Sequence, residues 1–155
     1  MQQCIKRMLT IIAILIATTA IHAADPIKVL IVDGPQKYHD FKKTTPILKE
    51  ILEKSGRFKV DLSRSTTAGC KDGSYKPDFS QYAVIVVNEG FGAQSWPKAT
   101  EEAFEKYISE GGGMVSYHAA NNAWPKWKAF NLMTGLGGWS GRNHKSGPYL
   151  YIDAT

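Results

Sequence analysis

The chain has 155 residues, a formal net charge of +5 at pH 7 and two cysteines. This length suits one domain rather than several. Because no basic run is interleaved with aromatic residues, the composition argues against a nucleic-acid partner.

Residues 1–23 have the features of a secretory signal peptide. Lys6 and Arg7 precede an almost entirely apolar run at 8–20, and Ala23 occupies the −1 position of a cleavage site. The apolar run is shorter than the roughly 20 residues that a membrane span needs. We therefore expect export to the periplasm or the extracellular space after cleavage near Ala23. The alternative is an uncleaved N-terminal anchor, which is the only membrane association that the sequence predicts.

The mature chain, 24–155, keeps 17 basic and 14 acidic residues, a net charge of +3, and a single cysteine, Cys70. A single thiol forms no internal disulfide, so we expect the hydrophobic core alone to hold the exported fold together. Cys70 lies in a polar segment, 64–81, that we predict to be a long exposed loop. No activating base lies near Cys70 in the sequence.

Strand and helix patterns alternate along the chain and predict a parallel α/β sheet. Continuous runs of β-branched residues indicate strands that are buried on both faces, and capping residues followed by proline indicate helix starts. In chain order, the predicted elements are a strand at 27–33, a helix at 44–56, a half-exposed strand at 58–62, the loop 64–81, a strand at 82–88, a helix at 95–109, a strand at 114–117, a short helix at 125–133, a glycine-rich loop at 135–147 and a strand at 149–152. This order fits a doubly wound sheet. Because the last strand begins with nothing after it, we expect the domain to be truncated at its C-terminus.

Polar residues follow the buried strands of the predicted sheet. Because the carboxyl ends of parallel strands meet at one edge, we expect these residues to converge on one crevice. The candidates are Asp33 and His39 after the first strand, Asn88 and Glu89 after the strand at 82–88, and His118 and Asn121 after the strand at 114–117.

His118 is the principal catalytic candidate because histidine titrates near neutral pH and acts as a general acid or base. It is also a candidate metal ligand, and the structural alternative is a histidine bonded to nearby backbone. His39 and Glu89 are expected to assist His118. Asp33 and Asn88 are candidate substrate contacts, with the alternative that they only satisfy the backbone where the strands end.

The glycine-rich loop at 135–147 contains a second candidate binding element. Gly138 allows close approach of a ligand, Trp139 offers an apolar face for a sugar ring, and Arg142 offers a rigid set of donors. The alternative is a tight connection packed by Trp139. The histidines lack the close spacing of a zinc motif, so a divalent metal, if one binds, would be assembled from distant segments with His118, His39 and His144 as candidates.

Several segments together resemble the ThuA-like (trehalose utilisation) family of the class I glutamine amidotransferase-like superfamily. The segments are Val32-Asp33-Gly34 with His39-Asp40-Phe41, Thr44-Thr45-Pro46-Ile47-Leu48, the stretch 111–122 and the stretch 137–142. The resemblance implies a flavodoxin-like three-layer sandwich with a mostly parallel sheet, of which 24–155 is the N-terminal part. Amidotransferases of that superfamily carry a nucleophilic cysteine at a turn after a strand. His118 falls at or next to that corner and no cysteine is nearby, so glutamine hydrolysis through a thioester is not expected.

The residues and the resemblance together predict an exported domain that acts on a sugar, a sugar derivative or another small polar ligand. An enzyme of this kind would be of the hydrolase or isomerase type. The alternative is a non-catalytic module that binds carbohydrate or another protein. The sequence assigns no cofactor and no oligomeric state.

Overall fold

Four parallel strands form the centre of the computed structural model, which describes residues 25–135. The sheet order is β2-β1-β3-β4, and its strands are β1 (Ile27–Asp33), β2 (Phe58–Arg64), β3 (Val84–Asn88) and β4 (Gly113–Ser116). The predicted parallel α/β class is confirmed. The predicted signal peptide, the glycine-rich loop and the strand at 149–152 lie outside the described residues.

The central strand β1 is buried on both faces, as its continuous β-branched run predicts. Leu30 and Val32 face one hydrophobic cluster, whereas Val29 and Ile31 face a second one. This alternation is the two-residue period of a strand, with both sides covered.

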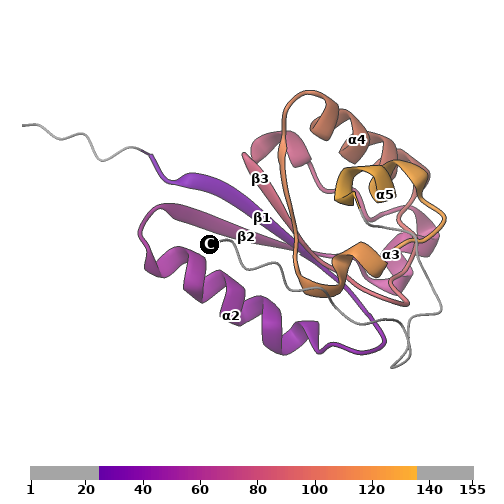
Figure 1. Cartoon of the computed structure of the whole chain (residues 1–155), viewed down its shortest axis with the longest axis horizontal. Coiled ribbons are helices and arrows are strands. Elements are labelled where there is room, and N and C mark those ends of the chain that lie inside the picture. Colours follow the sequence, from indigo (N-terminus) through magenta and orange to yellow (C-terminus); the bar gives the residue numbers. More distant parts are fainter. Residues whose placement is uncertain (1–24, 136–155) are drawn as a thin grey trace, which may run out of the picture.

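Helix α2 (Phe41–Lys54) covers one face of the sheet (Figure 1), where Leu48 and Leu52 pack against the second cluster. The helix begins three residues before the predicted start at Thr44, because the Asp40 side chain caps it by accepting a hydrogen bond from the Lys42 amide at 3.1 Å. Pro46 therefore lies inside the helix rather than in its first turn.

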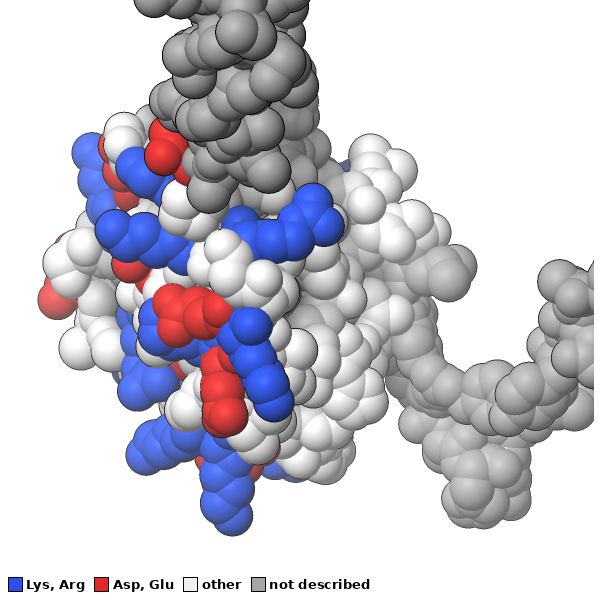
Figure 2. Space-filling model, turned by 90° about the vertical axis from the view of Figure 1, so that its left-hand side faces the viewer, with Lys and Arg blue, Asp and Glu red and all other residues white. Residues whose placement is uncertain are grey.

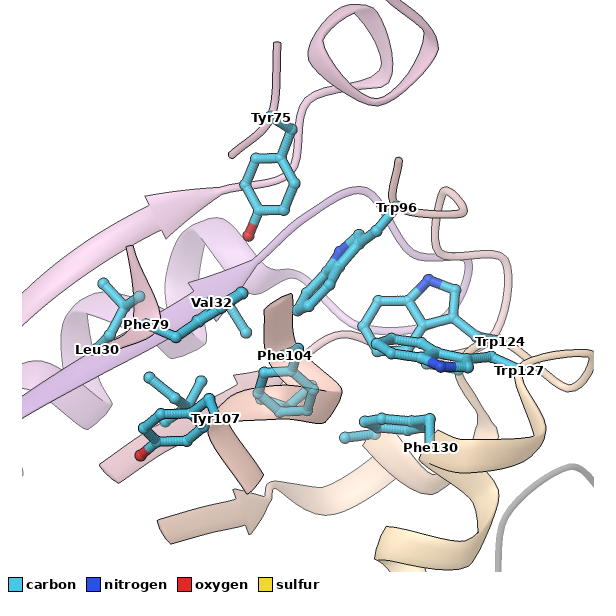
Figure 3. Packing of buried hydrophobic residues seen from close by; sticks show 14 residues of the cluster. Leu30, Val32, Tyr75, Phe79, Trp96, Phe104, Tyr107, Trp124, Trp127 and Phe130 are labelled. Carbon is cyan, nitrogen blue, oxygen red and sulfur yellow. The ribbon is translucent and has the colours of Figure 1, made fainter. Parts of the chain in front are cut away.

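Aromatic side chains fill the other side of the sheet (Figure 3), under α4 (Lys98–Ser109) and α5 (Lys128–Thr134). Trp96 lies at the centre of this cluster, with ring centroids 4.7 Å from Trp124 and 5.6 Å from Phe104. Trp96, Trp124 and Trp127 are all buried. The three tryptophans are thus part of the hydrophobic core.

The predicted loop at 64–81 contains structure that the sequence interpretation missed. It forms α3 (Thr67–Asp72) and the 3₁₀ helix η1 (Phe79–Gln81). Thr66 caps α3 by accepting from the Gly69 amide at 3.0 Å, and Gly73 ends it with a φ of 80°. Cys70 lies on α3, partly buried against the aromatic cluster, so its predicted place in an exposed loop was wrong.

Four further elements differ from their predicted bounds by one to three residues. Strand β3 starts at Val84 because η1 and its cap, Tyr82, occupy the preceding residues. Helix α4 starts at Lys98, after Pro97, and α5 covers Lys128–Thr134. The strand predicted at 114–117 is β4, Gly113–Ser116, followed at once by the 3₁₀ helix η2 (His118–Asn122).

Charges of both signs are interspersed on the side of the molecule that lies at the left of Figure 1 (Figure 2). Along the helices, Lys49 pairs with Glu53 at 2.7 Å and Lys98 with Glu101 at 3.7 Å. Among residues 25–135, no helix combines the length and the hydrophobicity that crossing a bilayer requires.

Candidate functional site

The carboxyl ends of the strands meet at one edge of the sheet, as the parallel topology requires. Asp33 at the end of β1 is in register with Arg64 on β2 and with Asn88 on β3, and Val87 on β3 is in register with Ser116 on β4. The residues that follow these strands are therefore neighbours in space although they are distant in sequence. We call this edge, with the loops that follow β1, β3 and β4, the rim.

The two candidate histidines within the described residues lie side by side on the rim. The ring centroids of His39 and His118 are 4.4 Å apart, with an angle of 53° between the ring planes. His39 is half-buried and His118 is exposed. One imidazole comes from the loop after β1 and the other from the turn after β4, so the sheet order creates this pair.

His118 has a backbone conformation that L-residues rarely adopt. The backbone ladder continues past β4, where the Tyr117 amide donates to the Val87 carbonyl at 3.1 Å, and His118 then turns the chain into η2 with a φ of 48°. A left-handed conformation of this kind costs a non-glycine residue about 1–2 kcal/mol. Strain of this kind clusters at functional sites, where the surrounding structure maintains it.

Asp33 is fully engaged by Arg64. The Arg64 guanidinium donates from Nε to Oδ1 at 2.8 Å and from Nη2 to Oδ2 at 2.9 Å, while it also lies 4.9 Å from the centroid of the Phe41 ring. Asp33 is buried, whereas the Arg64 side chain is 46% exposed. The hydrogen bonds to Asp33 raise the pKa of Arg64. The Asp33 carboxylate thus joins β1 to β2 below the surface of the rim.

Glu89 lies beneath the rim rather than on it. Its side chain is 1% exposed, and its Oε1 accepts hydrogen bonds from the Ser65 hydroxyl and, at 3.4 Å, from Trp96 Nε1. The other oxygen, Oε2, has no hydrogen-bond partner among the described residues. Burial raises the pKa of Glu89 to about 8, so the carboxyl group carries a proton at neutral pH.

The absence of a side chain at Gly34 lets the three strand ends approach one another. A Cβ at this position would lie 2.1 Å from Ser65 Oγ and 2.9 Å from Glu89 Oε2. Ser65 also donates from its amide to the Asp33 carbonyl at 2.7 Å. The loops after β1, β2 and β3 therefore close around one buried polar cluster, Gly34–Ser65–Glu89.

Asn88 connects β3 to α2. Its side-chain amide donates to the hydroxyls of Thr44 and Thr45, both at 2.9 Å, and the backbone carbonyl of Asn88 accepts from Gln36 Nε2 at 3.1 Å. Asn121 is half-buried in η2, three residues after His118. Of the predicted substrate contacts, Asp33 and Asn88 are thus hydrogen-bonded within the protein, and their contact with a substrate stays a prediction.

Arg64, Ser65 and Gln36 belong to this edge but were not among the sequence candidates. Arg64 and Ser65 come two and three residues after the strand predicted at 58–62, so the rule that polar groups gather at strand ends would have found them. They were assigned to a polar loop because the alternating strand appeared to end at Leu62, whereas β2 continues to Arg64.

Within residues 25–135, no group of three or more His, Cys, Asp or Glu side chains could hold a metal ion. His39 and His118 offer two imidazoles, and His144, the third candidate, lies outside the described residues, as do Gly138, Trp139 and Arg142. Two clefts, of about 710 and 580 Å³, lie elsewhere, next to Tyr107 and next to Trp127. Neither cleft includes either histidine.

Comparisons with known proteins agree with this architecture. The family model described as "ThuA: Trehalose utilisation" matches residues 28–153. A solved structure, of a ThuA-like protein from Parabacteroides merdae ATCC 43184, is 44% identical in sequence and has a TM-score of 0.68; the match covers 83% of this chain and 45% of that chain. The chain thus spans less than half the length of that protein. No curated protein matches it. From the family match and the parallel sheet, we conclude that the chain belongs to the ThuA family and has a flavodoxin-like α/β fold.

Proposed function

We propose that this domain acts in carbohydrate utilisation on a sugar or sugar derivative, with His118 as general acid or base and His39 as its partner. The observation that carries the proposal is the imidazole pair, whose ring centroids are 4.4 Å apart. The description of the matching family, trehalose utilisation, supports the substrate class.

Two adjacent imidazoles can divide the tasks of proton transfer. One ring accepts a proton from the substrate while the other donates one, which is the requirement of hydrolase-type and isomerase-type reactions on sugars. His118 is exposed, and the left-handed turn presents its ring at the end of β4. Proton transfer by a positioned side chain contributes about 10²–10⁴-fold to a rate.

Glu89 supports the pair from below in this proposal. Its hydrogen bond with Ser65 ties the loop after β2 to the loop after β3, and its proton avoids a buried negative charge under the rim. Glu89 is therefore a positioning residue. Asn121, in the same 3₁₀ helix as His118, is the substrate contact that this geometry favours.

The proposal does not include glutamine amidotransferase activity. Cys70 is the only cysteine within the described residues, and it lies on α3 against the aromatic cluster. Burial, with smaller effects of Glu89 and Asp72, raises its pKa to about 11. A neutral thiol is a weak nucleophile at pH 7, so thioester chemistry is not expected.

The test is turnover by the full chain and by His118→Ala and His39→Ala variants. Trehalose, methyl glucosides and their oxidised derivatives are incubated with each protein, and products are followed by NMR. We expect loss of turnover by 100-fold or more with an unchanged thermal melt, whereas Lys98→Ala, at an exposed position on α4, keeps full activity. Undiminished turnover by His118→Ala would refute its catalytic role, and saturable binding without any product would favour the binding-module alternative.

Export is the second component of the proposal, and it rests on the sequence of residues 1–23. Expression of the full chain in a bacterial host, followed by intact-mass analysis of the periplasmic fraction, tests it. We expect a mature protein that begins near Ala24. A membrane-bound protein of full mass would instead support the uncleaved anchor.

A further inference from the structure

Two large aromatic side chains, Tyr38 and Phe91, stand exposed on the rim. Their ring centroids are 5.7 Å apart and their planes are inclined by 25°. Tyr38 is 67% exposed and Phe91 is 44% exposed. The loop after β1 contributes one ring and the loop after β3 contributes the other, so the pair forms across two segments that are distant in sequence.

Backbone contacts, rather than burial, position these rings. The Lys37 amide donates to the Phe91 carbonyl at 2.8 Å, and the Ala93 amide donates to the Gly90 carbonyl at 2.9 Å. Gly92 allows the turn with a φ of 84°. Two loops that are hydrogen-bonded to each other therefore hold apolar surface out in the solvent, which does not help the domain to fold.

A cation completes the arrangement. Lys37 Nζ lies 5.3 Å from the centroid of the Tyr38 ring and 5.8 Å from that of the Phe91 ring. The ammonium group lies over both rings at cation–π distance and offers hydrogen-bond donors beside the aromatic surface. Apolar faces combined with a few polar groups are typical of sites that bind small polar molecules.

The aromatic pair and the histidines belong to adjoining loops of the rim. Tyr38 directly precedes His39, and a Cβ at Gly90, next to Phe91, would lie 3.6 Å from the Cβ of Ala119, next to His118. A molecule that stacks on the aromatic rings would place its substituents near the imidazoles. Exposed apolar area on structured loops is typical of binding sites.

We infer that Tyr38 and Phe91 form a stacking platform for a pyranose ring, with Lys37 bonding to its hydroxyl groups, beside His39 and His118. The sugar class rests on the function proposed above. The C–H groups on one face of a pyranose ring pack on aromatic faces, and its hydroxyl groups stay at the ring edge, where an ammonium group reaches them. The platform is thus a substrate-binding subsite, distinct from the glycine-rich loop that the sequence predicts.

Binding and turnover by the full chain separate the platform from the catalytic pair. With trehalose and methyl α-glucoside as probes, we expect Tyr38→Ala and Phe91→Ala each to raise the Kd, measured by ligand-observed NMR, at least tenfold. Tyr38→Phe, which keeps the ring, changes the Kd less than threefold. Ile51→Ala, an exposed apolar position on α2, leaves it unchanged and is the matched control. His118→Ala binds normally but does not turn over.

The outcomes distinguish the two proposals. Turnover with an unchanged KM in both alanine variants overturns the platform and leaves the proposed function standing. If neither sugar binds the wild type at millimolar concentration, both proposals fail. If adenosine binds instead, with the same dependence on Tyr38 and Phe91, the platform is an aromatic site but the pyranose assignment is overturned.

Discussion

Asp33 and Arg64 meet through two parallel hydrogen bonds, 2.8 and 2.9 Å long, across the neighbouring strands β1 and β2. The carboxylate is 1% exposed, and Arg64 is the one charged side chain that is hydrogen-bonded to it within the described residues. The pair therefore links β1 to β2 at the rim through an ion pair in which the Asp33 carboxylate is shielded from water.

Replacement of Arg64 by Met is expected to destabilise the domain by about 1–3 kcal/mol, because it leaves the buried Asp33 carboxylate without its donors. The loss stays in this range because almost half of the Arg64 side chain faces solvent, which screens the pair. Urea unfolding measures the change. Lys43→Met, which breaks an exposed ion pair of 3.7 Å with Asp40, is the control and should have almost no effect. Equal losses for both variants would contradict the special role of the buried carboxylate.

The stability of the domain should depend on pH through Glu89. Its pKa is raised to about 8 in the folded protein but is near 4.5 when the chain is unfolded, so the folded state binds more protons between these values. The free energy of unfolding therefore decreases as the pH rises from about 4.5 to 8, by at most about 1.4 kcal/mol per pH unit from this group. Glu89→Gln should remove that slope. Its free energy of unfolding should be close to that of the wild type at pH 5 and higher than that of the wild type at pH 8. Glu102→Gln, on the exposed side of α4, should keep the wild-type slope.

A methyl group at Gly34 should disrupt the buried cluster under the rim. Gly34→Ala places a Cβ 2.1 Å from Ser65 Oγ and is expected to cost about 1–3 kcal/mol. Because Ser65→Ala removes the closest atom, the double variant should lose less than the sum of the two single losses. Strictly additive losses in urea unfolding would mean that the two positions do not interact.

The left-handed turn at His118 predicts a difference between two variants that both lack the imidazole. His118→Gly should be more stable than His118→Ala by about 1 kcal/mol, since glycine adopts a φ of 48° without a steric penalty. At Tyr117, with a φ of −82°, the order of the same two substitutions should reverse. Thermal melts of the four variants make the comparison. An alanine variant at position 118 as stable as the glycine variant would remove the evidence for strain.

Cys70 should react slowly with thiol reagents. Burial raises its pKa to about 11, so little thiolate is present at pH 7.5. In a Cys4→Ser background, Cys70 is the only cysteine, and alkylation by iodoacetamide can be followed by mass spectrometry. We expect slow labelling of the folded protein and rapid labelling in urea. Labelling in the folded state as fast as that of free cysteine would show that the thiol is activated.

The architecture of the sheet could be predicted because its determinants are local. The continuous run at Ile27–Asp33 predicts a strand buried on both faces, and the structure places it at the centre of the sheet. The convergence of His39 and His118 on one edge follows from the same reasoning, since parallel strands end together. The start of α2 after its cap, Asp40, was missed because Thr44-Thr45-Pro46, taken alone, is an equally good start signal for a helix. Thr45 is instead buried inside the helix, where its hydroxyl accepts a hydrogen bond from Asn88, and this contact depends on the tertiary structure.

The sequence by itself determined the α/β class, the strands and the edge at which polar residues gather. Hydrophobic periodicity and the alternation of strands with helices are local patterns that short segments of the chain already show. Only the tertiary structure decided which of those polar groups are exposed and which are neutralised inside the protein. Asp33 meets Arg64 from 31 residues away, and Glu89 meets Ser65 from 24 residues away. Such partnerships depend on the order β2-β1-β3-β4, which brings together strand ends that no local pattern connects.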